Sequence, residues 1–175
     1  MIDISPNKYT FDETELDKFE NELGVILPRS YKHFLQKYNG GTPEPNIIEL
    51  KNEEIKSISI TDFFGVKNAQ INDLKFQYEI YKECIPNKHI PISRVEGGNI
   101  ICLGLENHYI SLWDHDTELL NADIKPNHPL IYIERNFEKF IEKIKPMKEN
   151  MDLQDYKIRD IWVDPDFLNE LNEDK

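Results

Sequence analysis

In four stretches of the chain, apolar residues recur at every third or fourth position, which places them on one face of a helix. In the clearest stretch, Pro28 suits a first helical turn, where no amide donor is needed, and Asn39 supplies a left-handed stop. Another stretch has a capping residue in Asp12 or Thr10 and a stop at Gly24. The spacing predicts helices over residues 12–23, 28–38, 71–84 and 137–145.

Between these helices, short runs of β-branched and other apolar residues are bounded by turn residues, as β-strands are. They predict strands over residues 46–50, 55–64, 89–95, 99–105, 109–114 and 130–133. The links within the central three are a few residues long, whereas a parallel return needs a dozen or more, so these strands pair antiparallel. The polar link between the first two strands likewise suits a hairpin. The expected fold is α+β, an antiparallel β-meander flanked by N-terminal, inserted and C-terminal helices.

Three blocks of the sequence resemble those of a known family. They are LGVILPRSYKHFLQKYNGG, then IPISRVEGGNIICLGL followed by ISLWDHD, and finally YIERNFEKFIEKI. In this order they are similar to the blocks of the SUKH superfamily, and they cover roughly residues 10–145. That superfamily groups bacterial immunity proteins of polymorphic toxin systems with fungal regulators of cell-wall synthesis, and the resemblance implies an antiparallel sheet with flanking helices. Asn99 stands where many members have an acidic residue, so a function that depends on that acid is not expected here.

The composition is that of a globular protein. At 175 residues, with 39 % apolar and 31 % charged residues, the chain is expected to form one domain over 1–145 and an acidic extension over 146–175. It lacks the start of a signal peptide, and apolar runs such as Ile100–Leu103 are too short to cross a bilayer. We therefore expect a cytoplasmic protein with no membrane partner. Cys84 and Cys102 fit a reducing compartment, and a structural role is expected for both.

The extension lies outside the resemblance but is too apolar for a free tail. Its apolar residues are Ile158, Ile161, Trp162, Val163, Phe167, Leu168 and Leu171. Asp164-Pro165 is a typical helix start. A tryptophan with several aliphatic neighbours is expected to be buried, either against this domain or against another chain, and we favour docking on this domain.

Negative charge is concentrated at both ends of the chain, whose formal net charge is −12. Residues 1–25 hold two basic and seven acidic side chains, residues 26–145 fifteen and seventeen, and residues 146–175 four and nine. A field of this sign repels nucleic acid and attracts basic proteins. We therefore expect a basic protein partner and no nucleic acid. Alternatively, the surplus carboxylates only keep the protein soluble.

One cluster of polar residues has the composition of a chemical site. The sequence Trp113-Asp114-His115-Asp116 lies at a strand end, with Glu118 close by. Such groups bind hard metals or transfer protons when they converge. In an extended segment, however, Asp114 and Asp116 share one face while His115 points away, so hydrogen bonding to the loop backbone is the favoured interpretation. Walker, GxSxG, paired CxxC and GxGxxG motifs are also missing, and we expect no catalysis, cofactor or metal.

Together with the resemblance, these features predict an immunity protein that binds and neutralises a cognate bacterial toxin, such as a basic nuclease. Acidic side chains at strand ends and links are the expected contact residues. They are Glu49, Glu53, Glu54, Asp114, Asp116 and Glu118. The alternatives are a regulatory adaptor without a toxin partner, as the fungal members suggest, and a metal-dependent enzyme that uses Asp114, His115 and Asp116. The sequence indicates no particular oligomeric state.

Overall fold

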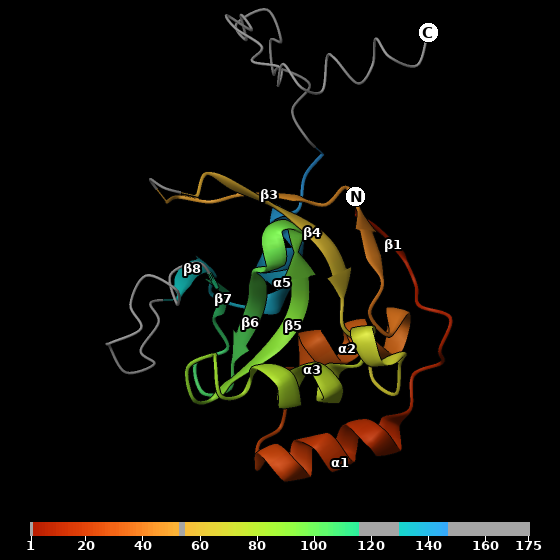
Figure 1. The fold of residues 1–175 in the computed structure, drawn as a ribbon. Coiled ribbons are helices and arrows are strands. Elements are labelled where there is room, and N and C mark those ends of the chain that lie inside the picture. The colour runs from red at the N-terminus through yellow and green to blue at the C-terminus, as the bar shows by residue number, and fades with distance from the viewer. Residues whose placement is uncertain (1, 53–54, 116–129, 147–175) are drawn as a thin grey trace, which may run out of the picture.

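A computed structural model describes residues 2–52, 55–115 and 130–146 of the chain (Figure 1). Within these ranges, an antiparallel sheet has the strand order β3-β4-β5-β6-β7-β8, so that each strand pairs with its neighbours in the sequence. The strands are β3 Ile47–Glu49, β4 Ser57–Phe63, β5 His89–Val95, β6 Ile100–Gly104, β7 Ile110–Trp113 and β8 Ile131–Glu134. The α+β class and the antiparallel meander predicted from the sequence are confirmed, including the β3–β4 hairpin.

The helices are α1 Glu13–Leu23, α2 Arg29–Tyr38, α3 Leu74–Tyr81 and α5 Phe137–Lys143, with short 3-10 turns η1 Gln70–Asn72 and η2 Glu96–Gly98. Of the two capping residues considered for α1, Asp12 is the one used, because its carboxylate accepts from the backbone N–H groups of Thr14 and Glu15 at 3.1 and 3.3 Å. Gly24 ends α1 and Asn39 ends α2, both in the left-handed conformation, as predicted.

The inserted helix is shorter than predicted. Residue 71 lies in η1, where Ile71 is 60 % exposed, and α3 begins only after Asp73. The Asp73 carboxylate accepts from the Phe76 N–H at 2.8 Å, so it acts as an N-cap inside the predicted range. The regular helix ends at Tyr81, ahead of Cys84 and Pro86. Asp73 therefore marks the start of α3, which the spacing of apolar residues alone did not indicate.

A small second sheet was not predicted. Strand β1, Asp3–Ser5, pairs antiparallel with β2, Thr42–Glu44, so that Ile4 lies opposite Pro43. Each strand has three residues with only the central one buried, which is too short to show a strand period. Gly41, next to β2, approaches the β1 backbone so closely that a Cβ there would lie 2.2 Å from the Ser5 carbonyl oxygen.

The core between α2, β4 and α5 is a cluster of aromatic rings. Phe34 of α2 lies edge-on to Phe63 of β4 and to Phe137 of α5, with ring centroids 4.9 and 5.1 Å apart. Trp113 of β7 contacts Tyr81 at the end of α3, 5.7 Å between centroids. Every residue of β6 and β7 is buried, and because neighbouring side chains alternate in direction, both faces of these strands are covered. Figure 1 shows α5 behind the sheet and α1 at the end of the domain opposite β3.

The position of Cys102 in the core supports the structural role predicted for it. It lies in β6 with no exposed surface, and burial raises the pKa of its thiol well above the usual value. The neutral thiol therefore packs as a small apolar group. Cys84, three residues beyond α3, is half-buried.

The end of α2 is fixed by a buried amide. The Asn39 side chain donates to the backbone oxygens of Tyr9 and Val66 at 3.1 and 3.0 Å, and it accepts from the Val66 N–H at 2.7 Å. Gly65 lies against the same residue, since a Cβ on Gly65 would be 2.0 Å from the Asn39 carbonyl oxygen. Asn39 therefore joins α2 to segments far away in the sequence.

Candidate functional site

The structure describes two of the predicted acidic residues, Glu49 and Asp114, and places them at the same end of the sheet but on strands that are not neighbours. In an antiparallel meander, β3, β5 and β7 all finish at the same end, which we call the carboxylate end. Glu49 is exposed at the end of β3, and Asp114 is partly buried directly after β7. Four strand spacings separate β3 from β7, about 19 Å in all. The predicted contact residues Glu53, Glu54, Asp116 and Glu118 lie outside the described residues.

The exit of β7 is held by a polar contact with the β5–β6 turn. The Asn99 side-chain oxygen accepts from the His115 backbone N–H at 3.1 Å and lies 2.7 Å from His115 Nδ1. Because this oxygen is an acceptor, the arrangement fits a histidine that carries its proton on Nδ1. Many superfamily members have an acidic residue at this position. A carboxylate oxygen there could accept the same two bonds, so the contact does not depend on which of the two residue types is present. The bond to a turn residue agrees with a structural role for His115.

The enzyme alternative needs several ligands or acid–base groups at the β7 exit. Within the ranges that the structure describes, no three His, Cys, Asp or Glu side chains lie close enough together to hold a metal ion. Asp116, the third residue of that alternative, is outside these ranges. The described part of the motif therefore offers Asp114 and His115, with the histidine already bonded to Asn99.

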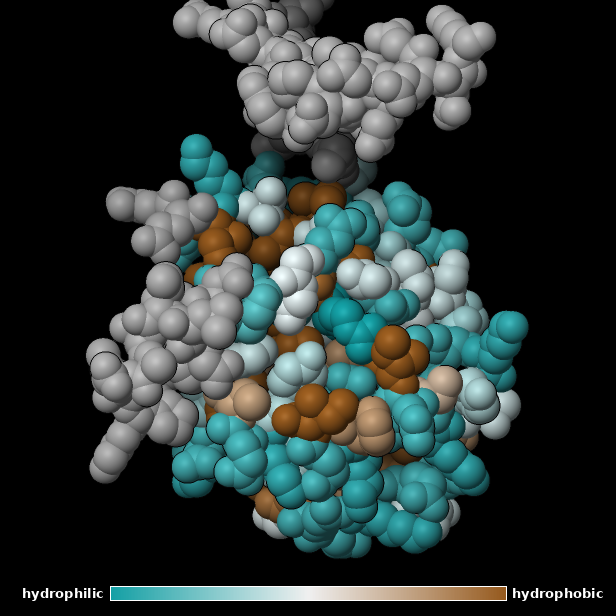
Figure 2. Space-filling model, viewed as in Figure 1, coloured by the Kyte–Doolittle hydropathy of each residue, from teal (hydrophilic) through white to brown (hydrophobic). Residues whose placement is uncertain are grey.

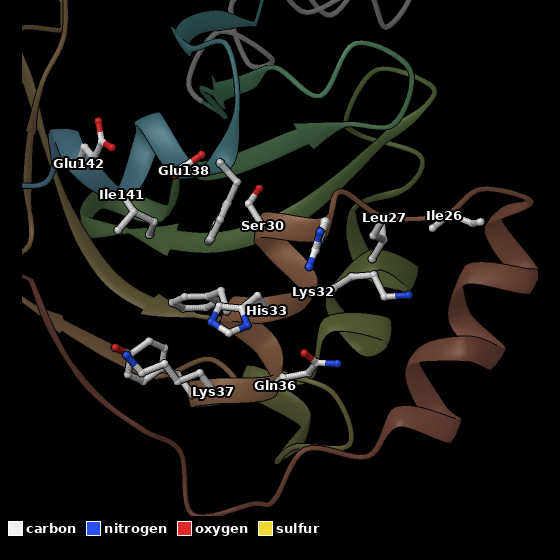
Figure 3. A pocket seen from close by; sticks show the side chains of 14 residues that line it. Ile26, Leu27, Ser30, Lys32, His33, Gln36, Lys37, Glu138, Ile141 and Glu142 are labelled. Carbon is white, nitrogen blue, oxygen red and sulfur yellow. The ribbon is translucent and has the colours of Figure 1, made fainter.

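A larger feature, which the sequence did not reveal, is a groove between α2 and α5 with a volume of about 1190 Å³ (Figure 3). We call it the α2–α5 groove. Its apolar lining comes from both helices and from the loop before α2. The apolar lining residues are Ile26, Leu27, Phe34, Tyr38, Phe137 and Ile141. Figure 3 shows Ile26 and Leu27 at the end of the groove nearest α1. Ile26 is 78 % exposed, the highest value among the exposed large apolar side chains of the described residues.

The two walls of the groove carry opposite charges. The wall formed by α2 has Arg29, Lys32 and Lys37, and the helix contains no acidic residue. The wall formed by α5 has Glu138 and Glu142. Counting these five side chains gives a local charge of +1, whereas the whole chain carries −12. The groove is thus positive relative to the rest of the protein.

One of the three cations on the α2 wall already forms an ion pair. Lys32 Nζ lies 2.9 Å from the Glu20 carboxylate of α1, and Glu20 also accepts from the Leu27 N–H at 2.7 Å. These contacts fix the loop that leads into α2. Arg29 and Lys37 form no ion pair with the described residues, although the Lys37 ammonium lies 4.7 Å from the centroid of the Tyr38 ring. Two cations of the wall are therefore available to a negative partner.

A second exposed apolar area lies on η1 and α3, and we call it the α3 patch. Its members Ile71, Phe76 and Ile80 are 60, 40 and 49 % exposed. Figure 2 shows apolar side chains on this side of the molecule separated by hydrophilic ones. Arg94 holds η1 in place by donating to the Ile71 carbonyl oxygen at 2.8 Å. The α3 patch is interrupted by hydrophilic side chains, whereas the α2–α5 groove is a hollow with apolar side chains from both helices.

Comparison with known proteins agrees with the fold. The sequence pattern of the SMI1 / KNR4 family (SUKH-1) matches residues 10–143, which is most of the chain. The chain is also similar to the SPbeta prophage-derived uncharacterized protein YokK of Bacillus subtilis (strain 168), with 27 % identity over 174 residues that cover 89 % of this chain and 85 % of that protein. In the described residues, no helix has the length and apolar character needed to cross a membrane. With its antiparallel meander, flanking helices and matching sequence pattern, the chain belongs to the SMI1/KNR4 family (SUKH-1).

Proposed function

We propose that this protein is an immunity protein that binds a cognate bacterial toxin and neutralises it by stoichiometric protein–protein binding. The observation that carries the proposal is the SUKH-1 match over residues 10–143, because SUKH proteins are immunity or regulatory proteins. The similarity to YokK also supports this assignment, because that relative is described as prophage-derived and thus comes from a mobile element.

The charge of the chain favours a basic toxin. A net charge of −12 accelerates the approach of a cationic protein and disfavours direct binding to nucleic acid. We assign the first encounter to the acidic residues at the carboxylate end and in its connecting segments. These are Glu49, Glu53, Glu54, Asp114, Asp116 and Glu118. Charges at the rim of an interface act mainly on the association rate, so a further group of side chains must hold the complex.

Two exposed tyrosines, one just before β7 and one on β8, are suited to that second task. Tyr109, just before β7, and Tyr132 of β8 are 45 and 54 % exposed, and their rings pack edge to face with centroids 5.5 Å apart. Partial desolvation and the nearby Glu134 carboxylate raise the pKa of Tyr132 above its usual value, and its hydroxyl is neutral near pH 7 even without this shift. Rigid tyrosines that combine apolar area with a hydrogen-bonding group are typical interface anchors.

The direct test is co-expression with the products of neighbouring toxin-like genes. The expected result is rescue of growth by the full chain together with a complex that survives co-purification. A toxin of the same activity class from an unrelated system is the matched control, and it is expected to remain lethal. Failure of both rescue and binding with every neighbouring gene product would remove the immunity assignment. Binding without rescue would support the regulatory adaptor instead.

A further inference from the structure

We propose that the C-terminal extension of this chain, residues 147–175, occupies the α2–α5 groove, with its apolar residues between Ile158 and Leu171 on the groove floor. This inference is independent of the toxin assignment. It rests on three features: an apolar groove open to solvent, the place where the described chain ends, and a match of charge between the groove and the extension.

The groove exposes apolar surface that a partner is expected to cover. Ile26 is 78 % exposed at its rim, and Ile141 of α5 is only half-buried. The floor beneath them consists of Phe34 and Phe137, which already belong to the aromatic core. An apolar side chain that enters the groove would therefore extend an existing core, which is the most favourable place for Trp162 or Phe167.

The extension starts beside one wall of the groove. Residue 145 follows α5 closely and is fixed by a pair of backbone bonds, since Lys145 N–H donates to the Ile47 oxygen at 2.8 Å and Ile47 N–H donates back at 3.1 Å. The eleven residues from 147 to 157 reach as far as about 36 Å when extended. Helix α2, with ten residues, is about 15 Å long. The first apolar residue of the extension, Ile158, therefore reaches any point of the groove.

Charge distinguishes the groove from the α3 patch as the docking place. The extension from 146 to 175 has four basic and nine acidic side chains. Arg29 and Lys37 on the groove wall have no carboxylate partner in the described residues, so an acidic segment would give them one. Lysines beside the α3 patch already have partners, since Lys75 pairs with Glu22 at 2.5 Å and Lys82 with Glu79 at 2.6 Å.

Docking changes the surface that α2 presents. With the groove open, α2 exposes a basic, apolar face on an otherwise acidic protein. With the extension in place, the apolar floor is covered and the five net negative charges of the extension lie over the cations of the wall. The α2 face then has the same sign as the rest of the protein, and a basic partner meets no repulsive region there.

Acrylamide quenching of tryptophan fluorescence in the full chain tests this proposal. The chain has two tryptophans, and Trp113 is only 3 % exposed, so quenching reports mainly on Trp162. Trp162 is expected to be shielded in the wild-type chain. Arg29→Glu combined with Lys37→Glu is expected to increase its quenching constant several-fold, and adding Asp164→Lys with Asp166→Lys to the same chain is expected to restore the shielding. Ile141→Asp, which places a charge in the apolar lining of the groove, is expected to expose Trp162 in the same way.

The matched control is Lys51→Glu with Lys56→Glu, which makes the same change of charge at two exposed lysines that do not line the groove. It is expected to leave the quenching unchanged, and circular dichroism checks that each variant is folded. Free quenching of Trp162 in the wild-type chain would overturn the proposal. Shielding that persists in both groove variants, or that is lost only in Ile80→Asp, would place the extension elsewhere and overturn it too. Shielding that disappears on dilution would identify a second copy as the occupant and would contradict it equally.

Discussion

The α2–α5 groove and the carboxylate end of the sheet belong to one domain, but they offer a partner opposite properties. The groove has an apolar floor, continuous with the aromatic core, and a wall with two unpaired cations among the described residues. The carboxylate end places charged groups such as Glu49 and Asp114 on strand ends about 19 Å apart. The difference shows that a net charge of −12 for the whole chain does not describe the charge of each surface.

The largest loss of unfolding free energy is expected from a substitution in the aromatic core beneath the groove floor. Phe63→Ala removes a fully buried ring that packs on Phe34, and such a change in a dense core costs about 3–5 kcal/mol of unfolding free energy. Guanidinium denaturation followed by circular dichroism measures the loss. The matched control is Tyr31→Phe in the same cluster. The Tyr31 hydroxyl is buried and has no hydrogen-bond partner among the described residues, so its removal is expected to cost less than about 1 kcal/mol. Equal losses in the two variants would contradict the packing described above.

The next largest loss of stability is expected from Asn39, whose buried side-chain amide holds the end of α2. Asn39→Ala leaves the Val66 N–H and two carbonyl oxygens without their partner, and a loss of about 2 kcal/mol is expected. Asn39→Asp keeps the acceptor for Val66 but places a buried carboxylate oxygen against the Tyr9 and Val66 carbonyl oxygens, so it is expected to cost more than Asn39→Ala. Denaturation of both variants and of the wild-type chain measures the two losses. A cost below about 0.5 kcal/mol for Asn39→Ala would show that the network does not position the groove wall.

A third variant sharpens the contrast between the surfaces through binding kinetics. If the carboxylate end steers the toxin, Glu49→Lys with Glu53→Lys is expected to lower the association rate constant about tenfold at low salt, with little change in dissociation. Glu13→Lys with Asp17→Lys makes the same charge change on exposed positions of α1. Surface plasmon resonance at two salt concentrations measures both. An equal fall in the two double variants would mean that net charge acts without a preferred surface.

The smallest loss of stability is expected from the ion pair between β8 and α5, Glu134 with Lys143, 3.1 Å apart. A backbone hydrogen bond from Arg135, with further help from Lys143, holds the pKa of Glu134 below its usual 4.5. The carboxyl group is thus more acidic in the folded chain, so its contribution to stability is present above pH 4.5 and is lost as the pH falls through the lower folded pKa. Glu134→Gln is expected to lower stability slightly at pH 7, and by progressively less as the pH falls below 4.5. A pH-independent difference between the two proteins would contradict this account.

The sequence predicted elements whose signals are local. Asp12, Gly24 and Asn39 define helix ends through their own chemistry, and the short links of the meander determine antiparallel pairing without any distant information. The three-residue β1–β2 ribbon was missed because such short strands show no period. The start of α3 was misplaced because the cap, Asp73, lies within an apolar repeat.

The candidate site was harder to predict for a related reason. The groove joins α2 to α5, which is about one hundred residues further along the chain, and no local pattern indicates that two helices will be neighbours. A usable signal was the absence of acidic residues from α2 in a strongly acidic chain, which marks one helix face as different. Glu49 and Asp114 lie at strand ends, as the local pattern indicates, but the distance between them depends on strand order.

The most direct test of the account is a titration of the toxin's activity with the purified full chain. Neutralisation by binding predicts that activity falls linearly to zero at a fixed molar ratio of about one to one when both proteins are well above their dissociation constant, with the toxin recovered chemically intact. Loss of activity that proceeds with time at a small fraction of that ratio, or recovery of a modified toxin, would show turnover and would contradict neutralisation by binding.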